Sequence, residues 1–347
     1  MQPSHPSTLT FPFAVPPEPG KLTDVAPGIR WLRLPLPYRL DHVNVYLIEN
    51  DGGWTVFDTG LGTDTSKDTW EAALAGPLKG QRLKSLIVSH FHPDHIGLAG
   101  WLCERHMLEL TMPRPEYLHS LLLQFAPADY GEDVFRPFYQ RHGLSAEATE
   151  IVLSRGHEYL KRTTGVPASY HRIKHSDTLA VGARSFQVLT GGGHALEQAM
   201  LYRPQEQLFI AADQVIARIS PNVSVHPMEP GLDALGIYLD SLRAIKANVA
   251  PDVLVLPGHG LPFYGLHDRV EELIAHHRQR CGEIAAACKQ TPMSVAEIVP
   301  VLFTRPLDAH QTGFAFGEVL AHVNHMLGRS ELRLETDVGG VDRYCTI

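Results

Sequence analysis

The sequence predicts a protein of the α+β class with a mostly helical C-terminal part. The chain has 347 residues, of which 44% are hydrophobic and 20% charged, so it can bury a sizeable core. Two observations carry the prediction. Short apolar strands alternate with an amphipathic helix over residues 43–88, and further strands follow over residues 178–256. From Leu266 on, the pattern becomes helical.

The first predicted elements are a hairpin, a helix and a strand. Residues 43–48 and 54–57 are β-rich runs, and Glu-Asn-Asp-Gly-Gly at 49–53 supplies turn chemistry between them. Residues 64–78 place apolar side chains on one helical face. Residues 83–88 form a short apolar strand that ends at a histidine-rich segment. This order indicates an α/β alternation.

The middle of the chain, residues 113–170, interrupts that rhythm. It contains helix-like stretches at 116–125 and 145–162, the second opening on Ser145 as an N-cap, and several aromatic residues. Two interpretations stay open and are compatible. The insertion is a helical hairpin that packs on itself, or a lid that faces the substrate.

The remaining elements follow in order. Four strands are predicted at 178–181, 185–189, 199–202 and 208–211, then a helix at 232–247 and a strand at 253–256. Helices are predicted at 266–289, 294–302 and 314–327, and a hairpin at 332–335 and 342–345. The proline-rich residues 1–25 are expected to form an extended arm.

Composition excludes several classes of function. The formal net charge of −8 disfavours nucleic acid as a partner, and no apolar stretch approaches the ~20 residues of a membrane span. The four cysteines are scattered and form no C-x-x-C pair. We therefore expect reduced thiols in a cytoplasmic protein that acts on a small molecule.

The segment from His90 to His95 carries the strongest chemical signal. It places His90, His92, Asp94 and His95 at the end of a predicted strand, where nitrogen and oxygen ligands can project together. The chain contains 20 histidines, and histidine is the commonest metal ligand. This segment therefore predicts a metal site.

Three distant residues complete the pattern. His194, Asp213 and His259 each follow an apolar strand. Because strand C-termini gather at one edge of an α/β sheet, we expect these side chains to meet the first segment there.

In this order, the motifs resemble those of the metallo-β-lactamase superfamily. His90-Phe91-His92-Pro93-Asp94-His95 matches its H-x-H-x-D-H signature, and Asp58, His194, Asp213 and His259 resemble its other motif residues. The resemblance covers about two thirds of the chain. It implies an αββα sandwich of two mixed sheets between helices, with a binuclear metal site at one edge. Three glycines precede His194 where the family usually has Pro-Gly, which predicts a wider loop.

The resemblance also implies how the ligands are shared. The first metal would take His90, His92 and His194, the second would take Asp94, His95 and His259, and Asp213 would bridge. Asp58 would orient a ligand without binding metal. The expected cofactors are two divalent metal ions, zinc first, with iron or manganese as alternatives.

We therefore expect a metal-dependent hydrolase. A metal-bridging hydroxide would attack an ester, thioester or lactone carbonyl of a small apolar substrate. Asp94, as the catalytic residue, or the bridging site would then relay a proton to the leaving group. Asp213 in place of a cysteine disfavours antibiotic hydrolysis. The alternatives are an iron-dependent sulfur oxidoreductase of persulfide dioxygenase type, an endoribonuclease-like phosphodiesterase, and a regulatory protein that only binds a ligand.

Three segments are expected: the arm, a catalytic domain over 26–265, and a C-terminal domain over 266–347. The last resembles the small winged-helix-like domain of some superfamily members. Seven basic against ten acidic side chains over 271–347 disfavour nucleic-acid binding. We expect a packing module or a homodimerisation module. His322 and His325 are three apart on a predicted helix, where a satisfied helix face is favoured over a metal pair.

Overall fold

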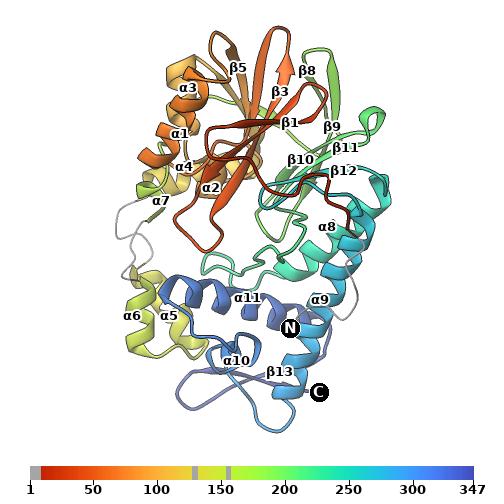
Figure 1. The fold of residues 1–347 in the computed structure, drawn as a ribbon. Helices are drawn as coiled ribbons and strands as arrows, with labels where there is room; N and C mark the ends of the chain where they lie inside the picture. The colour runs from red at the N-terminus through yellow and green to blue at the C-terminus, as the bar shows by residue number, and fades with distance from the viewer. Residues whose placement is uncertain (1–8, 127–131, 154–157) are drawn as a thin grey trace. The chain divides into compact units, whose positions relative to one another are not determined.

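The computed structural model describes residues 9–126, 132–153 and 158–347, which divide into two compact units (Figure 1). Unit 1 comprises Met1–Phe125, Tyr159–Pro221 and Arg243–Val270. Unit 2 comprises Ala126–Glu158, Asn222–Leu242 and Glu271–Ile347. The segments 126–158 and 222–242 thus group with the C-terminal part of the chain, whereas the sequence analysis assigned them to the catalytic domain.

Unit 1 contains a seven-stranded sheet whose strand order follows the chain. Its strands are β1 (Leu22–Ala26), β2 (Ile29–Pro35), β3 (His42–Asn50), β4 (Gly53–Phe57), β5 (Arg82–Ile87), β6 (Glu109–Pro113) and β7 (His171–Ile173). Strands β1 to β4 pair antiparallel, and β4 to β7 pair parallel. The predicted hairpin is therefore confirmed. Residues 22–26, which overlap the predicted arm, pair with β2 instead.

A five-stranded sheet forms the second layer of unit 1. In sheet order its strands are β12 (Leu254–Pro257), β11 (Leu208–Ala212), β10 (Gln198–Arg203), β9 (Arg184–Gly191) and β8 (Thr178–Val181). Strands β11 and β12 are parallel, and the other pairs are antiparallel. The carboxyl ends of β11 and β12 therefore lie side by side.

Strand β3 shows how the layers are packed. Tyr46 and Ile48 belong to a core formed by residues of both sheets, whereas Val45 and Leu47 belong to a second core that includes Trp70 of α1. Successive side chains of a strand point to opposite faces, so β3 is buried on both. The large sheet thus lies between the small sheet and helices, as the predicted sandwich requires.

The helices of this unit have clear local causes. They are α1 (Asp64–Ala75), α2 (Pro93–Ile96), α3 (Ala99–His106) and α4 (Arg114–Phe125), with a 3-10 turn, η1 (Pro204–Glu206). Thr63 caps α1 by accepting from the Ser66 amide, and the indole of the fully buried Trp70 donates to the Thr59 carbonyl at 2.9 Å. Helix α1 is thereby fixed to the loop that follows β4.

Unit 2 is mostly helical and ends in a two-stranded sheet. It contains α5 (Glu132–Arg141), α6 (Ala146–Leu153), α10 (Val295–Leu302), α11 (Ala309–Gly328), β13 (Leu332–Thr336) and β14 (Asp342–Thr346). Three of the unit boundaries fall within helices, namely α7 (Glu158–Lys161), α8 (Ala234–Asn248) and α9 (Leu266–Ala287). Ser294 and Glu297 form a reciprocal capping box that starts α10. The predicted C-terminal hairpin is confirmed, and its Tyr344 pairs with Met293.

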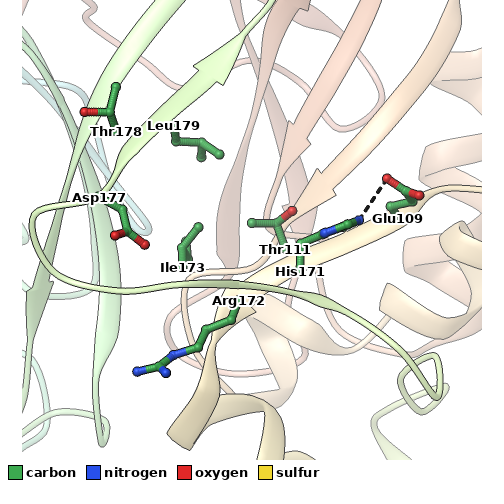
Figure 2. Close-up of a pocket in the computed structure, with 8 residues that line it drawn as sticks. All are labelled: Glu109, Thr111, His171, Arg172, Ile173, Asp177, Thr178 and Leu179. Atoms are coloured by element: carbon green, nitrogen blue, oxygen red, sulfur yellow. Dashed lines mark hydrogen bonds and ion pairs between the residues drawn. The ribbon is translucent and has the colours of Figure 1, made fainter.

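A pocket of about 480 Å³ lies beside the edge strands β7 and β8 of unit 1 (Figure 2). Its lining includes Glu109 and His171, which form an exposed ion pair at 3.0 Å. None of the predicted metal ligands lines it. Over the described residues, no helix combines the length and apolar character that crossing a bilayer demands.

Candidate metal centre

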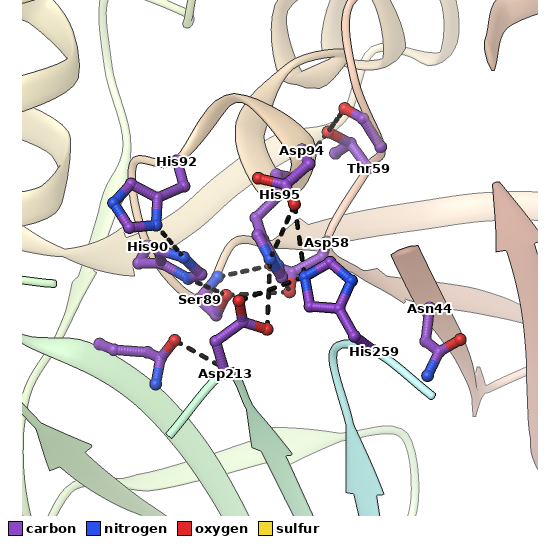
Figure 3. A network of polar contacts seen from close by, with 12 residues as sticks. Asn44, Asp58, Thr59, Ser89, His90, His92, Asp94, His95, Asp213 and His259 are labelled. Carbon is purple, nitrogen blue, oxygen red and sulfur yellow. Dashed lines mark hydrogen bonds and ion pairs between the residues drawn. The ribbon is translucent and has the colours of Figure 1, made fainter. Parts of the chain in front are cut away.

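The predicted ligands, and the supporting Asp58, lie beyond strand ends in unit 1. Asp58 follows β4, the segment 90–95 follows β5, Asp213 follows β11, and His259 follows β12. His194 lies in the loop between β9 and β10. Figure 3 shows the cluster that results, with side chains from both sheets pointing toward one another.

Three histidines form the first group. His90 Nε2 lies 3.0 Å from His92 Nδ1, which lies 3.1 Å from His194 Nε2. His90 is fully buried, and His92 and His194 are of intermediate burial as whole residues, although the side chain of His194 is only 7% exposed. Three imidazole nitrogens at this spacing could hold one metal ion.

A second group consists of Asp94, His95 and His259. His259 Nε2 lies 3.3 Å from Asp94 Oδ2, and His95 Nε2 lies 3.7 Å from the same oxygen. These three side chains could hold a metal ion through two nitrogens and one oxygen.

Asp213 lies between the two groups. Its Oδ1 is 3.4 Å from His95 Nε2, and its Oδ2 is 3.2 Å from His259 Nε2 and 3.4 Å from His194 Nε2. One carboxylate thus faces nitrogens of both groups. His90, His95 and Asp213 also satisfy the spacing of a metal-holding triplet.

In His95 and His259, the ring nitrogen that points away from the cluster, Nδ1, contacts an oxygen of the protein. His95 Nδ1 lies 2.8 Å from Asp58 Oδ2, and Asp58 also accepts from the Ser89 amide and hydroxyl. His259 Nδ1 donates to the His42 carbonyl at 2.7 Å. These contacts turn Nε2 of His95 and of His259 toward the cluster and fix the orientation of both rings. Asp58 therefore contacts a histidine of the second group, as the resemblance implied.

Two further residues hold the strand ends, and the sequence analysis did not identify them. The side-chain NH₂ group of Asn44 donates to the carbonyls of Pro257 and Gly260, on either side of His259, at 2.9 Å each. Gln198 accepts from the Asp213 amide at 3.2 Å. Both lie within strands and belong to no motif, so only the pairing of distant segments reveals them.

Burial and charge divide the histidines into two kinds. Burial, with the neighbouring histidines, holds the pKa of His90 and His92 well below the usual range, so both are neutral and can donate a lone pair. Burial alone would also lower the pKa of His95 and His259. Asp213 and Asp94 outweigh it, and they raise the pKa of His259 to about 10 and that of His95 well above its usual value.

The residues fit a bound cation. His95 Nε2 and Asp213 Oδ1 are buried polar atoms without a hydrogen-bond partner among the described residues, and they face each other. Buried polar atoms are normally satisfied, so an unpaired nitrogen and carboxylate oxygen at one point indicate a missing shared partner. Imidazole nitrogens with two carboxylates are the donor set of a borderline divalent metal.

The structure brings all seven predicted ligands together. They are His90, His92, Asp94, His95, His194, Asp213 and His259. His322 and His325 lie instead on α11 of unit 2, where His322 bonds His277 at 3.1 Å and His325 bonds Asp233 at 3.1 Å. The satisfied helix face predicted for them is thus what the structure shows.

This fold and cluster define a metallo-hydrolase built on two packed sheets. A family model described as the metallo-β-lactamase superfamily matches residues 38–259, and one described as metallo-β-lactamase-like, C-terminal domain, matches residues 281–347. The chain belongs to the metallo-β-lactamase superfamily, because the first model alone covers more than half of it.

Several relatives agree with this assignment. The structure is similar to a β-lactamase domain protein from Burkholderia ambifaria, with 40% identity, a TM-score of 0.89 and 98% of each chain covered. It is also similar to a metallo-β-lactamase family protein from Thermus thermophilus, with 27% identity, a TM-score of 0.79, and 93% of this chain and 100% of that one covered. A Bacillus subtilis protein named probable metallo-hydrolase YqjP is 21% identical over 276 residues, covering 78% of this chain and 84% of the relative.

Proposed function

We propose that this chain is a hydrolase that binds two divalent metal ions, with zinc as the preferred ion, and cleaves an ester, thioester or lactone of a small apolar substrate. The observation that carries the proposal is the position of Asp213. Its two oxygens lie 3.2–3.4 Å from nitrogens of the three-histidine group and of the group formed by Asp94, His95 and His259. A carboxylate so placed would bridge two ions.

The ligand assignment follows the two groups. The first ion would take His90, His92 and His194, and the second Asp94, His95 and His259, with Asp213 shared. When bound, such ions lower the pKa of a coordinated water from ~15.7 toward ~7 and polarise a carbonyl oxygen.

Asp94 is the carboxylate placed to move a proton. Its side chain is 23% exposed, compared with 7% for Asp213 and 1% for Asp58. Burial would raise the pKa of Asp94, but His95 and His259 outweigh burial and hold it below the usual range, so Asp94 is an ionised acceptor. It could therefore take a proton from the attacking water and pass it to the leaving group.

Two apolar side chains that neighbour the three-histidine group in the sequence, Phe91 and Leu196, support an apolar substrate. The Phe91 ring contacts the His92 ring at a centroid distance of 4.7 Å and the His119 ring at 4.3 Å, and the Tyr159 hydroxyl donates to the Phe91 carbonyl. Leu196, two residues after His194, is 41% exposed. Both ends of the predicted 113–170 insertion therefore contact Phe91, which supports a role in binding the substrate.

A substrate panel tests the proposal. Acyl-thioesters, lactones and aryl esters are assayed with zinc-loaded and manganese-loaded protein, and oxygen uptake with a persulfide is measured on iron-loaded protein. We expect carbonyl hydrolysis that stops on chelation. Oxygen uptake with the persulfide, or cleavage only of a phosphodiester, would instead support one of the alternatives named above.

A further inference from the structure

Glu116 is a buried carboxylate that the metal groups do not include. It lies in the first turn of α4 and is fully buried. Its Oε2 accepts from the Phe91 amide at 3.0 Å, and its Oε1 accepts from the Glu197 amide at 2.5 Å. Its partners in the described part of the chain are thus backbone N–H groups rather than a lysine or arginine. Burying an ionisable group in this way is costly, so its position calls for a function.

The two amides belong to the loops that supply the three-histidine group. Phe91 lies between His90 and His92 on the loop after β5, in the seven-stranded sheet. Glu197 lies three residues after His194 and directly before β10, in the five-stranded sheet. One side chain therefore joins two loops from different sheets. A second tie between these sheets, from the Ala199 amide to the Ser89 carbonyl at 2.9 Å, involves the backbone alone.

We propose that Glu116 is a positioning residue that sets the distance between His194 and the pair His90 and His92, and thereby the metal affinity of the three-histidine group. The proposal rests on the proposed function, because that function assigns a metal to these three residues. Replacing a residue that positions a metal ligand without binding the metal itself changes metal affinity about 10–100-fold. The second group has its own supports, Asp58 and the His42 carbonyl, so it should be unaffected.

A carboxylate is required by the contacts. Each Glu116 oxygen accepts from a different N–H, so both ends of the group must be acceptors. A glutamine of the same shape offers one carbonyl and one NH₂ group, and the NH₂ group would oppose one of the amides. Glu116→Gln should therefore release one loop without leaving a cavity.

Stepwise cobalt(II) titration of apoprotein tests this, with the metal per chain measured by elemental analysis and the visible absorption recorded. His92→Ala and His259→Ala serve as references for loss of the first and second group. Glu109→Gln, which changes an exposed glutamate of β6, is the matched control. We expect Glu116→Gln to lose affinity about 10–100-fold at one site only, with the spectrum of His92→Ala. Glu109→Gln should load like the wild type.

Every other result of the cobalt titration also decides whether the proposal stands. Wild-type loading of both sites in Glu116→Gln would overturn the proposal, as would equal weakening of both sites. If Glu116→Gln does not fold by circular dichroism, Glu116→Asp, which keeps the charge but is too short to reach both amides, replaces it with the same expectation. Loss of fold in both variants would make Glu116 a requirement of the fold alone. A wild-type chain that binds no transition metal would contradict the proposed function itself, whereas the outcomes above leave that function standing.

Discussion

His95 Nε2 and Asp213 Oδ1 lie 3.4 Å apart in the interior of unit 1, and neither atom has a hydrogen-bond partner among the described residues. His95 lies on α2, the short helix that follows β5, and Asp213 lies directly after β11, so segments that follow strands of the two sheets meet at this pair. The other oxygen of Asp213 faces His194 and His259. Among the described residues, Asp213 is thus the carboxylate that faces nitrogens of both metal-holding groups.

Asp213→Ala should therefore damage both metal sites, whereas His95→Ala should remove one neutral ligand from the second group alone. Metal per chain in Asp213→Ala, measured by elemental analysis after identical purification, should fall well below that of His95→Ala. His259→Ala should behave like His95→Ala. Equal metal content in Asp213→Ala and His95→Ala would mean that Asp213 does not bridge.

Asp58→Asn tests the support of His95. The Asp58 carboxylate accepts from His95 Nδ1 and from the Ser89 hydroxyl. The Asp58 backbone has a positive φ of 65° directly after β4. An asparagine can present its NH₂ group to His95 and so change the tautomer of the ring. We expect metal affinity at the second group to fall about 10–100-fold, with little change at the first. Competitive titration against a chelator measures both, and uniform weakening would contradict this role.

Gly258→Ala tests how closely the backbone approaches the centre. A Cβ at Gly258 would collide with Asp213 Oδ1 and come within 2.9 Å of His95 Cε1. Asp213 would have to move, so the variant should lose metal while it retains its fold. Gly282→Ala is the control, because its added Cβ meets no described heavy atom within 4 Å apart from the neighbouring residues and backbone of its own helix. Retention of wild-type metal content by Gly258→Ala would show that the site tolerates the displacement.

The pair His277 and His322 predicts acid sensitivity of unit 2. Burial, aided for His277 by the charge of His322, lowers the pKa of His277 to about 2 and that of His322 to about 4. Below pH ~6.5 the unfolded chain takes up these protons and the folded chain does not, so stability falls with falling pH by about 1.4 kcal/mol per pH unit for each histidine. The loss from His322 ends near its folded pKa of about 4.

His277→Gln should reduce that pH dependence. A glutamine can still donate to His322 Nε2 but does not titrate. Thermal melts between pH ~6.5 and ~4.5 should show a smaller fall of Tm in His277→Gln than in the wild type. His175→Gln, which replaces an exposed histidine, is the control. An unchanged slope in His277→Gln would indicate that this histidine does not cause the acid sensitivity.

Much of the centre could be predicted because its residues follow apolar strands in recognisable motifs. The fold was harder where local signals are weak. Strand β2 carries Arg30 and Arg33 among its apolar residues, β7 has three residues, and α5 contains Pro137. These elements are fixed by pairing or packing with distant segments, which a local pattern does not show.

Helix α11 illustrates the same limit at a boundary. It begins at Ala309, five residues before the predicted start, because Asp308 caps it by accepting from the Gln311 amide at 2.9 Å. The predicted N-cap of α6 was correct, since Ser145 accepts from the Ala148 amide. The predicted helix over 145–162 also includes residues 154–157, which lie outside the described part of the chain.

Glu116 shows why the supports of the centre escape prediction altogether. It lies more than 20 residues from the nearest ligand in the sequence and belongs to no motif. Only the folded chain brings it to the Phe91 and Glu197 amides. Metal ligands can be identified from residue type and spacing, whereas the residues that hold them depend on tertiary contacts.

Metal content measured together with hydrolysis tests the central claim most directly. Protein purified without chelator is analysed for bound metal and assayed on the carbonyl substrates before chelation, after it, and after reloading with zinc. The account predicts two ions per chain, loss of hydrolysis on chelation and its return on reloading. A chain that carries no transition metal and hydrolyses these substrates equally well before and after chelation would contradict it.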